Sequence, residues 1–169
     1  MPSPNVITTS QLSRLIGTPD APVIVDVCID EDFHEDPRLI PTAIRHPFGQ
    51  IDQLAPVLSG QRVVIVCHRG KKLSQGAAAI LRNYGITAEL LDGGIVAWRE
   101  AGLPVVPVAK IPDRNQDGQT VWVTRHRPKI DRIACPWLIR RFVDPRAQFL
   151  FVAPAEVLDV ADKFNATPF

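Results

Sequence analysis

The sequence lacks any long run of apolar residues. Across its 169 residues, no stretch approaches the roughly 18 to 20 consecutive apolar residues that a membrane-spanning helix needs. The first residues, Met1-Pro2-Ser3-Pro4, also lack the basic segment and apolar stretch that are typical of a secretory signal. We therefore expect no membrane partner and a cytoplasmic location.

Excess charge and paired cysteines are also missing. The formal net charge is only +1, which argues against a protein whose whole surface binds nucleic acid. The three cysteines, Cys28, Cys67 and Cys135, are odd in number and form no Cys-x-x-Cys pair, which predicts free thiols in a reducing compartment. No metal-ligand spacing links His34 or His46 to a cysteine, so we expect no metal site. We also expect no cofactor.

What the sequence does contain is an apolar run that ends in a cysteine. Residues 62–66 are predicted to form a buried strand, Cys67 follows, and a basic loop leads into an alanine-rich helix predicted over 74–84. A thiol at this junction faces a helix N-terminus and backbone N–H groups, both of which favour the thiolate. Because the thiolate is the nucleophilic form, Cys67 is the candidate nucleophile.

Strands and helices alternate along the first hundred residues. Each predicted strand is a continuous apolar run, which is typical of a parallel sheet covered by helices on both faces. The predicted fold class is therefore α/β with a mostly parallel central sheet. The predicted strands lie at 22–27, 62–66 and 87–91, with a turn into a short strand at 40–45. The predicted helices lie at 8–17, 51–58, 74–84 and 93–101, and the acidic stretch 30–36 is predicted to be loop-like, with room for one helical turn.

A proline-rich and then polar stretch indicates a domain boundary. Pro104, Pro107 and Pro112 precede the polar run 113–118. We expect a first domain over residues 1–106, a linker over 107–118 and a second, partial α/β unit over 119–169. In that unit, strands are predicted at 120–124 and 147–152 and helices at 130–142 and 156–164, with Pro136 kinking the first helix or marking its start.

Four motifs in the first domain resemble a rhodanese domain, the sulfurtransferase fold. They are Val25-Asp26-Val27, Ile40-Pro41-Thr42-Ala43, Cys67 with Gly70 three residues on, and Gly93-Gly94 with Trp98, followed by Gly102-Leu103-Pro104-Val105. In that family the loop cysteine takes a sulfane sulfur from a small anion such as thiosulfate. It becomes a persulfide and passes the sulfur to cyanide or a thiol.

The resemblance implies a role for each residue of the loop. Cys67 would be catalytic, and the substrate-binding residues would be His68, Arg69, Gly70, Lys71, Lys72, Leu73 and Ser74, with Asp26 in support. Backbone amides of the loop can point at the terminal sulfur. Arg69, Lys71 and Lys72 can attract an anionic donor and stabilise the leaving sulfite.

The loop departs from the family pattern in ways that bear on the donor. Lys72 stands where the family has arginine, and a lysine lacks the bidentate fork for an oxyanion. Cys28 stands where arginine follows the family's Asp-Val, and Thr42 replaces a glycine. Related tyrosine phosphatases and arsenate reductases need an arginine where this chain has Leu73, which argues against their chemistry.

The tail, from about residue 120, resembles the start of a ChrB-type chromate-resistance domain. Two segments, 122–125 and 127–142, carry the resemblance, with the distinctive run Ala134-Cys135-Pro136-Trp137 inside the second. That family's domain is longer than the residues available here, so we expect a truncated version. The resemblance implies a role near chromate or oxyanion response.

Several residues keep two interpretations. Cys28 is either a small buried residue or a thiol that resolves oxidised Cys67 as a disulfide. Asp26 either orients the loop or acts as a base, and His68 either tunes the thiolate or faces solvent. The basic residues Arg125, Arg127, Lys129, Arg132, Arg140 and Arg141 form either an anion site or a solvated surface that pairs with the acidic stretch 30–36.

The leading hypothesis is a rhodanese-type sulfurtransferase with a small sulfur-containing anion as donor and a thiol or cyanide as acceptor. The alternative is a non-catalytic sensor of oxyanion or redox state in a chromate-resistance regulator. A third and weaker hypothesis is a nucleic-acid-associated regulator that acts through the basic tail. The tail has neither a helix-turn-helix nor interleaved aromatic residues, so a nucleic-acid partner is not the favoured interpretation. A homodimer is left open.

Overall fold

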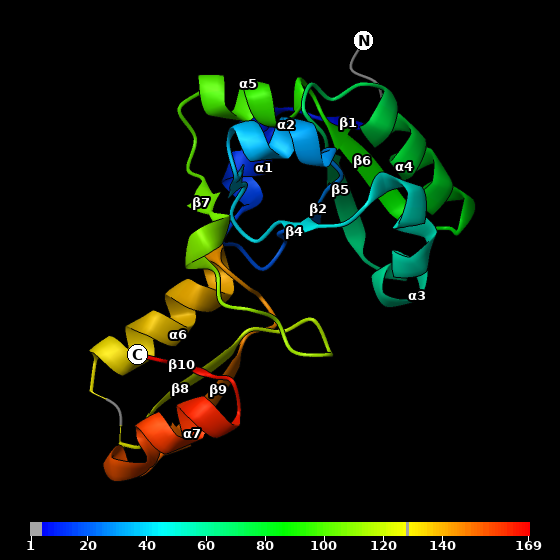
Figure 1. Cartoon of the computed structure of the whole chain (residues 1–169). Helices are drawn as coiled ribbons and strands as arrows, with labels where there is room; N and C mark the ends of the chain where they lie inside the picture. The colour runs from blue at the N-terminus through cyan, green and yellow to red at the C-terminus, as the bar shows by residue number, and fades with distance from the viewer. Residues whose placement is uncertain (1–4, 128) are drawn as a thin grey trace. The chain divides into compact units, whose positions relative to one another are not determined.

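The computed structural model describes residues 5–127 and 129–169, and the chain divides into two units, Met1–Val108 and Ala109–Phe169 (Figure 1). The first unit contains a five-stranded parallel sheet with the order β1-β6-β5-β2-β4. Its strands are β1 (Val6–Ile7), β2 (Val23–Asp26), β4 (Ile44–Arg45), β5 (Arg62–Val66) and β6 (Thr87–Leu91). This parallel α/β arrangement confirms the predicted fold class.

Helices cover both faces of this sheet. They are α1 (Thr9–Leu15), α2 (Asp30–Glu35), the 3-10 helix η1 (Phe48–Leu54), α3 (Ala55–Leu58), α4 (Lys72–Asn83) and α5 (Gly94–Glu100). One core contains alternate residues of two neighbouring strands, Val25 and Val27 with Val63 and Ile65, packed with residues of α3 and α4. Since strand side chains alternate between faces, buried Ile24 and Val64 face the opposite side, where α1 and α5 lie (Figure 1).

Local sequence explains where the first helix begins and ends. The Thr8 hydroxyl accepts a hydrogen bond from Gln11 N–H at 3.2 Å, and the Gln11 side chain accepts one from Thr8 N–H at 2.9 Å. This reciprocal pair is a capping box, which satisfies two N–H groups that the helix leaves unpaired. Gly17 follows the helix with a φ of 80°. The prediction of a helix over 8–17 is confirmed with slightly shorter bounds.

The acidic stretch that was predicted as a loop forms helix α2. Asp30, Glu31 and Asp32 occupy its first turn, where negative side chains interact favourably with the positive end of the helix. Phe33 is buried and fixes the helix against the first unit. The prediction of a loop-like stretch with one helical turn underestimated this helix, which has six residues. Acidic composition is typical of irregular structure, whereas acidic residues in a first turn favour the helix.

A short antiparallel pair lies apart from the main sheet. It joins β3 (Arg38–Leu39) to β7 (Val106–Pro107), and η2 (Val108–Lys110) follows. Arg99 of α5 donates to the Asp36 carbonyl at 2.7 Å and pairs with the Asp36 carboxylate at 3.2 Å. The end of the first unit is thus bound to the segment that follows α2.

The second unit contains a three-stranded parallel sheet with the order β10-β8-β9. Its strands are β8 (Val121–Arg125), β9 (Gln148–Val152) and β10 (Thr167–Pro168), and its helices are α6 (Asp131–Phe142), η3 (Pro154–Glu156) and α7 (Val157–Lys163). Val121, Val123 and Ala166 form its small core with residues of β9 and α7. Helix α6 continues through Pro136, which lies inside it.

A buried carboxylate connects the start of the second unit to its sheet. Asp144 accepts hydrogen bonds from Thr120 N–H at 2.7 Å and from its hydroxyl at 2.8 Å, and it pairs with Arg114 at 3.1 Å. Arg114 also forms an isolated antiparallel bridge with Thr120. Part of the segment predicted as a linker over 107–118 is therefore bound to residues of the second unit.

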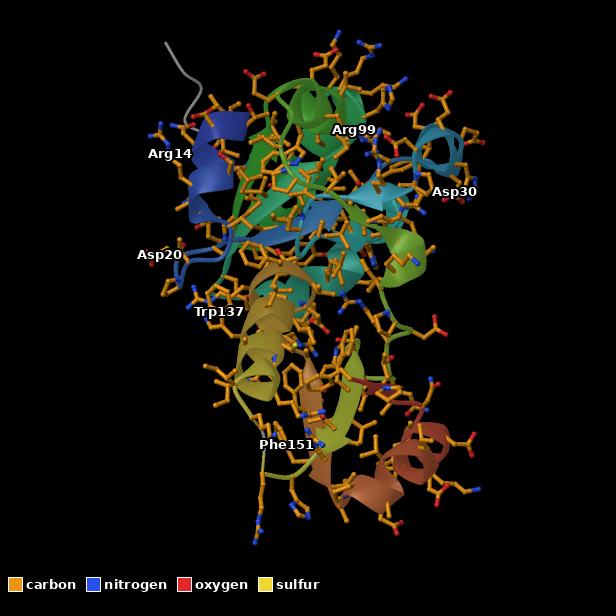
Figure 2. All side chains as sticks on the ribbon, turned by 90° about the vertical axis from the view of Figure 1, so that its left-hand side faces the viewer. Arg14, Asp20, Asp30, Arg99, Trp137 and Phe151 are labelled. Carbon is orange, nitrogen blue, oxygen red and sulfur yellow. The ribbon has the colours of Figure 1, made fainter. Side chains whose placement is uncertain are left out.

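Several large apolar side chains of the second unit are exposed. On α6 they include Trp137, which is 55% exposed, and on β9 they include Phe151 at 47% (Figure 2). The second unit therefore buries its apolar residues less completely than the first. None of the helices within residues 5–127 and 129–169 combines the length and apolar character that crossing a bilayer requires.

Thr42 adopts a backbone conformation that β-branched residues avoid. Its φ is 69°, in the left-handed region, in the turn before β4. We expect Thr42→Gly to raise the free energy of unfolding by about 1 kcal/mol, because removing the left-handed penalty outweighs the extra freedom of glycine in the unfolded chain. Urea unfolding followed by circular dichroism measures this difference.

The matched control is Thr42→Ala, which also removes the branched side chain but keeps a Cβ atom at the same φ. We expect little gain from alanine. An equal gain in both variants would show that the side chain, and not the backbone conformation, is the source of the strain.

Candidate functional site

The candidate nucleophile lies at the carboxyl edge of the parallel sheet. Cys67 follows the last residue of β5, and the neighbouring strand β2 ends at Asp26. Val27 N–H donates to Val66 O at 2.8 Å, which continues the β2–β5 pairing to the edge. Ligands of open α/β sheets bind outside the carboxyl ends of the strands, so Cys67 lies where this architecture places chemistry.

The loop after Cys67 packs backbone against backbone on the start of α5. Ile95 N–H donates to Cys67 O at 3.0 Å, and Val96 N–H donates to His68 O at 3.1 Å. Gly94 permits this approach, because a Cβ atom on it would lie 2.1 Å from Cys67 O and 2.5 Å from Gly70 N. The Gly93-Gly94 pair therefore fixes the position of the loop.

The Cys67 side chain points into the protein. The residue is 4% exposed and belongs to the apolar core between the sheet and α4. Its polar neighbour is Ser74, whose hydroxyl lies 3.2 Å from Cys67 Sγ and donates to Lys71 O at 3.1 Å. Ser74 is itself fully buried in the first turns of α4. The expectation that this thiol faces backbone N–H groups is therefore not met: within the described residues, the hydrogen bond of Cys67 Sγ is to Ser74 and none comes from a backbone N–H.

The basic side chains of the loop face solvent. Arg69, Lys71 and Lys72 are exposed. No ion pair involves them within the part of the chain that the structure describes. Helix α4 begins at Lys72 with no side-chain cap. Its first N–H groups and the three cations together give this side of the loop a positive potential.

The remaining loop residues are less exposed than the cations. Gly70 has a φ of 65°, and a Cβ atom on it would lie 2.4 Å from Leu91 O, so the chain needs glycine there. Leu73 packs against the core that contains Cys67. His68 is half-buried, and its Nδ1 is buried without a hydrogen-bond partner among the described residues.

Asp26 and Cys28 form a second buried group beside Cys67. The Asp26 carboxylate accepts a hydrogen bond from Cys28 N–H at 2.8 Å. Burial raises the pKa of Asp26 above its usual value, although that hydrogen bond and the positive charges of Arg45 and Arg99 oppose the effect. Burial, followed by the charge of Asp26, strongly raises the pKa of the Cys28 thiol. Cys28 is therefore protonated at neutral pH.

Arg45 and His46 lie at the same edge of the sheet, although no motif in the sequence identifies them. Arg45 ends β4 and donates to Cys28 O at 3.0 Å, and His46 N–H donates to Asp26 O at 2.9 Å. The available signal was their place at the end of the strand that precedes the Cys67 strand. Among residues 5–127 and 129–169, no group of three or more His, Cys, Asp or Glu side chains could hold a metal ion.

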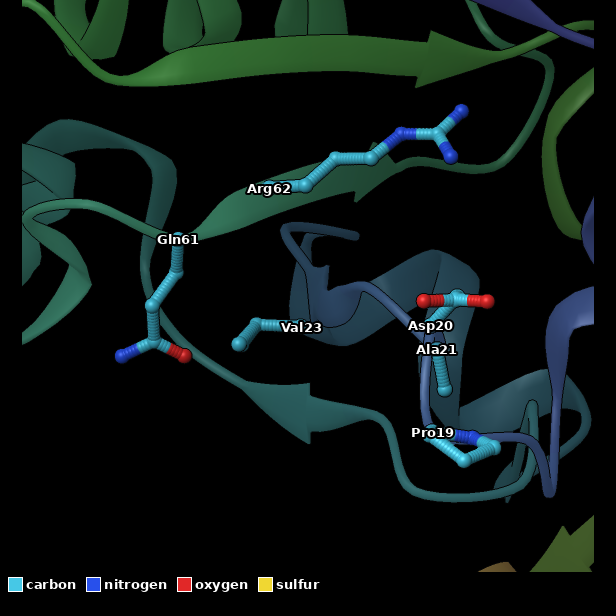
Figure 3. A pocket seen from close by; sticks show the side chains of 6 residues that line it. All are labelled: Pro19, Asp20, Ala21, Val23, Gln61 and Arg62. Atoms are coloured by element: carbon cyan, nitrogen blue, oxygen red, sulfur yellow. The ribbon is translucent and has the colours of Figure 1, made fainter.

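A hollow of the first unit lies at the opposite edge of the sheet. It measures about 540 Å³ and is lined by the residues that precede or begin β2 and β5, including Asp20, Val23 and Arg62 (Figure 3). The Arg62 guanidinium is already paired with Glu89 at 2.6 Å. This hollow contains no nucleophile, so its size does not make it the reaction site.

Comparison with known proteins gives the two parts of the chain different relatives. The family described as a Rhodanese-like domain matches residues 8–101, and the family described as ChrB, C-terminal domain, matches residues 122–169. A sulfurtransferase of Allochromatium vinosum is 29% identical over 104 residues, which are 60% of this chain and 94% of that protein. These matches agree with both predicted resemblances.

Two further relatives define how far the likeness extends. Protein ChrB of Cupriavidus metallidurans is 58% identical over 31 residues, which are 18% of this chain and 10% of that protein. This chain therefore matches only a tenth of the ChrB protein's length. A thiosulfate sulfurtransferase structure from Pseudomonas aeruginosa is 29% identical with a TM-score of 0.53, covering 63% of this chain and 20% of that one.

We expect Gly94→Ala to displace the Cys67 loop and to destabilise the first unit by about 2 to 5 kcal/mol, because the new Cβ atom meets backbone atoms in a left-handed conformation. The change is measured by urea unfolding. The matched control is Gly102→Ala, which has a similar φ of 66° but no atom within 4 Å of the new Cβ. It should cost only about 1 kcal/mol. Equal losses in both variants would contradict the proposed contact.

We expect Asp26→Asn to be more stable than the wild type at neutral pH. A carboxyl whose pKa is raised in the folded state binds its proton more tightly there, so its stabilisation is present at acid pH and is lost as the pH rises through the folded pKa. The variant has no proton to lose at this position. Its advantage in the free energy of unfolding should therefore grow as the pH rises.

The measurement is urea unfolding of both proteins from about pH 3 to 7, the range above and below an ordinary Asp pKa. Thr42→Ala, which changes no titratable group, is the control over the same series. A stability difference that stays constant with pH would contradict the prediction.

Proposed function

We propose, for a chain that belongs to the rhodanese-like family, that Cys67 is the nucleophile of a sulfurtransferase. The observation that carries this proposal is the fixed position of the Cys67 loop on the start of α5, with Cys67 Sγ 3.2 Å from the Ser74 hydroxyl. Sulfur transfer needs one thiolate held near hydrogen-bond donors. It needs neither a metal ion nor a general base.

The first step takes a sulfane sulfur from a small anionic donor such as thiosulfate. The Cys67 thiolate attacks the outer sulfur of the donor and forms a new S–S bond, while the donor's own S–S bond breaks and sulfite leaves with the electron pair. Exposed Arg69, Lys71 and Lys72 attract the doubly charged donor. N–H groups of the loop and of the first turn of α4 would stabilise negative charge on the sulfur and on the leaving sulfite.

The buried position of Cys67 limits which donors can react. A residue that is 4% exposed admits a single sulfur atom at the tip of a small anion more readily than a sulfur within a bulky molecule. Ser74 lies close enough to donate its hydroxyl proton to the charged sulfur in place of Lys71 O. Lys72 would contribute charge without the two-pronged hydrogen bonding of an arginine.

The second step returns Cys67 to its starting state. The thiolate of an acceptor, or cyanide, attacks the terminal sulfur of the persulfide and forms a bond to it. The bond between that sulfur and Cys67 Sγ breaks, and the electron pair remains on Cys67 as the thiolate. No external oxidant or reductant enters the cycle. The cytoplasmic location remains an expectation, and so does the linker over 107–118.

We expect thiosulfate treatment to add about 32 Da, one sulfur atom, to Cys67 in the wild type. Cys67→Ala should lose both the added mass and the production of thiocyanate from thiosulfate and cyanide, because no other thiol replaces the nucleophile. Peptide mass spectrometry and a thiocyanate assay measure the two effects.

Cys135→Ser is the matched control, because it removes the exposed cysteine of α6. It should keep both the added mass and the activity of the wild type. Thiocyanate production by Cys67→Ala at the wild-type rate would disprove the proposed mechanism.

A second candidate is a non-catalytic sensor of oxyanion or redox state. The observation that favours it is the match of residues 122–169 to the ChrB C-terminal family, since the corresponding resemblance implies a role near chromate response. A wild type that makes no thiocyanate but binds chromate would favour the sensor over the sulfurtransferase.

A further inference from the structure

The three-stranded sheet of the second unit has one unprotected edge. Its order is β10-β8-β9, so β9 pairs with β8 on one side only. An edge strand presents a row of unpaired N–H and C=O groups, and proteins usually keep such strands short or place charged residues or proline in them. The opposite edge strand, β10, has only two residues, one of which is Pro168. By contrast, β9 has five residues, none of them charged and none of them proline.

The edges of the first unit are protected by their length. The edge strands β1 and β4 of its sheet have two residues each, and so do β3 and β7 of the separate antiparallel pair. Within the part of the chain that the structure describes, β9 is therefore the one edge strand long enough to offer a template for another strand.

The outward-facing backbone groups of β9 belong to its phenylalanines. Gln148 N–H donates to Thr120 O at 2.9 Å, so residue 148 faces β8. Successive residues of a strand direct their N–H and C=O groups to opposite neighbours, so Leu150 also faces β8, whereas Phe149 and Phe151 face away from it. Outside the sheet, no backbone group among residues 5–127 and 129–169 pairs with the N–H or C=O groups of these phenylalanines.

The phenylalanine side chains lie on the face of the sheet that α6 covers. Leu150 packs against the core on the α7 side, so its neighbours Phe149 and Phe151 point to the other face. There the Arg140 guanidinium of α6 lies 5.0 Å from the centre of the Phe149 ring, and α6 and α7 lie on opposite sides of the sheet (Figure 1). Phe151 remains exposed, as does Trp137 of α6. The face beside the open edge is therefore incompletely covered.

We propose that the edge of β9 pairs with β9 of a second copy of this chain, antiparallel and about a two-fold axis at Leu150. In this register Phe149 lies opposite Phe151 of the second copy. Both residues direct their backbone groups outward, so each such pair exchanges N–H···O bonds in both directions, as the hydrogen-bonded pairs of an antiparallel ladder do. The axis at Leu150 also pairs every residue of β9 with a residue of the second β9.

A second copy is favoured over an unrelated strand because β9 is complementary to itself. In the proposed register each phenylalanine meets a phenylalanine on the same face, and cross-strand aromatic pairs stabilise a sheet. No charge lies opposite another charge. The two α6 helices lie on the same face of the joined sheet, on either side of the axis. The pairing therefore accounts for the open edge and covers exposed Phe151, and it does not depend on the chemistry of Cys67.

The first experiment measures the molar mass of the full chain by size-exclusion chromatography with multi-angle light scattering. Between about 1 and 100 μM we expect the mass to rise from the 18.7 kDa of one chain to about twice that value. A single-chain mass at every concentration would overturn the proposal. Species larger than a dimer would also overturn it, because a two-fold pairing leaves no further β9 edge.

The second experiment removes a backbone donor from the edge. Phe151→Pro deletes an N–H that faces the second copy and leaves the ladder to β8 complete, as for prolines found on edge strands. We expect the dissociation constant of the dimer to rise at least about tenfold, because half of the hydrogen bonds between the copies lose their donor. Far-ultraviolet circular dichroism and urea unfolding check that the variant folds.

The matched control is Phe164→Ala, which also removes an exposed aromatic side chain of the second unit but lies after α7 and away from β9. It should leave the dissociation constant unchanged. Equal weakening by the folded Phe151→Pro and Phe164→Ala variants would overturn the assignment of the contact to β9.

Cysteine crosslinking tests the register without breaking the strand. The background is Cys135→Ser, because Cys135 is exposed whereas Cys28 and Cys67 are buried. Leu150→Cys places a thiol at the axis, where opposite Cα atoms of the two copies are about 4.5 Å apart, a separation that a disulfide spans. Gln148→Cys, on the same strand and face, lies about 13 Å from its own copy and cannot form one.

We expect mild oxidation to give a disulfide-linked dimer with Leu150→Cys and none with Gln148→Cys, as measured by non-reducing gel electrophoresis and mass spectrometry. Equal crosslinking of both variants, or no crosslinking of Leu150→Cys, would overturn the proposed register.

Discussion

The close approach of two backbone segments determines the rest of the site. The carbonyl groups of Cys67 and His68 accept hydrogen bonds from the first turn of α5, and only a residue without a side chain at Gly94 permits that distance. Since Arg69, Lys71 and Lys72 are exposed, their side chains do not hold this part of the loop in its place. This contact holds the loop, with its three solvated cations, in one position around the Cys67 sulfur. Gly70 allows the same close approach from the loop side, because a Cβ atom on it would meet Gly93 N and Gly94 N.

The parts of the fold that the sequence predicted are those with a strong local signal. The apolar run before Cys67, the capping box at Thr8 and the glycines after α1 and α4 each act within a few residues. The strands of the sheet other than the two-residue β1, and most of its helices, were therefore predicted. Helix α2 was predicted only as a loop-like stretch with one helical turn, because its stability comes from buried Phe33 and from acidic residues at the helix start, and composition alone does not separate these from a loop. The β3–β7 pair was missed because it joins segments about seventy residues apart.

The candidate site divides in the same way. The motif order identified Cys67 and its loop as the candidate site, because these residues are continuous in sequence; their catalytic role stays a prediction. The helix was predicted to begin at Ser74, but α4 begins at Lys72. Ser74 therefore lies within the first turn of α4, where its hydroxyl is 3.2 Å from Cys67 Sγ. Arg45 and His46 come from a separate strand that contributes only two residues to the sheet. Their place beside Cys28 depends on strand order, which spacing along the chain does not give.

The hydrogen bonds between the α5 amides and the loop affect the side from which an anion approaches the Cys67 sulfur. Because Ile95 and Val96 already donate to carbonyl groups of the loop, the start of α5 has less positive potential to offer a ligand, and the uncapped start of α4 becomes the favoured side for an anion. The exposed side chains of Lys71 and Lys72 stand at this same start of α4, so their charge adds to the potential of the uncapped helix instead of opposing it.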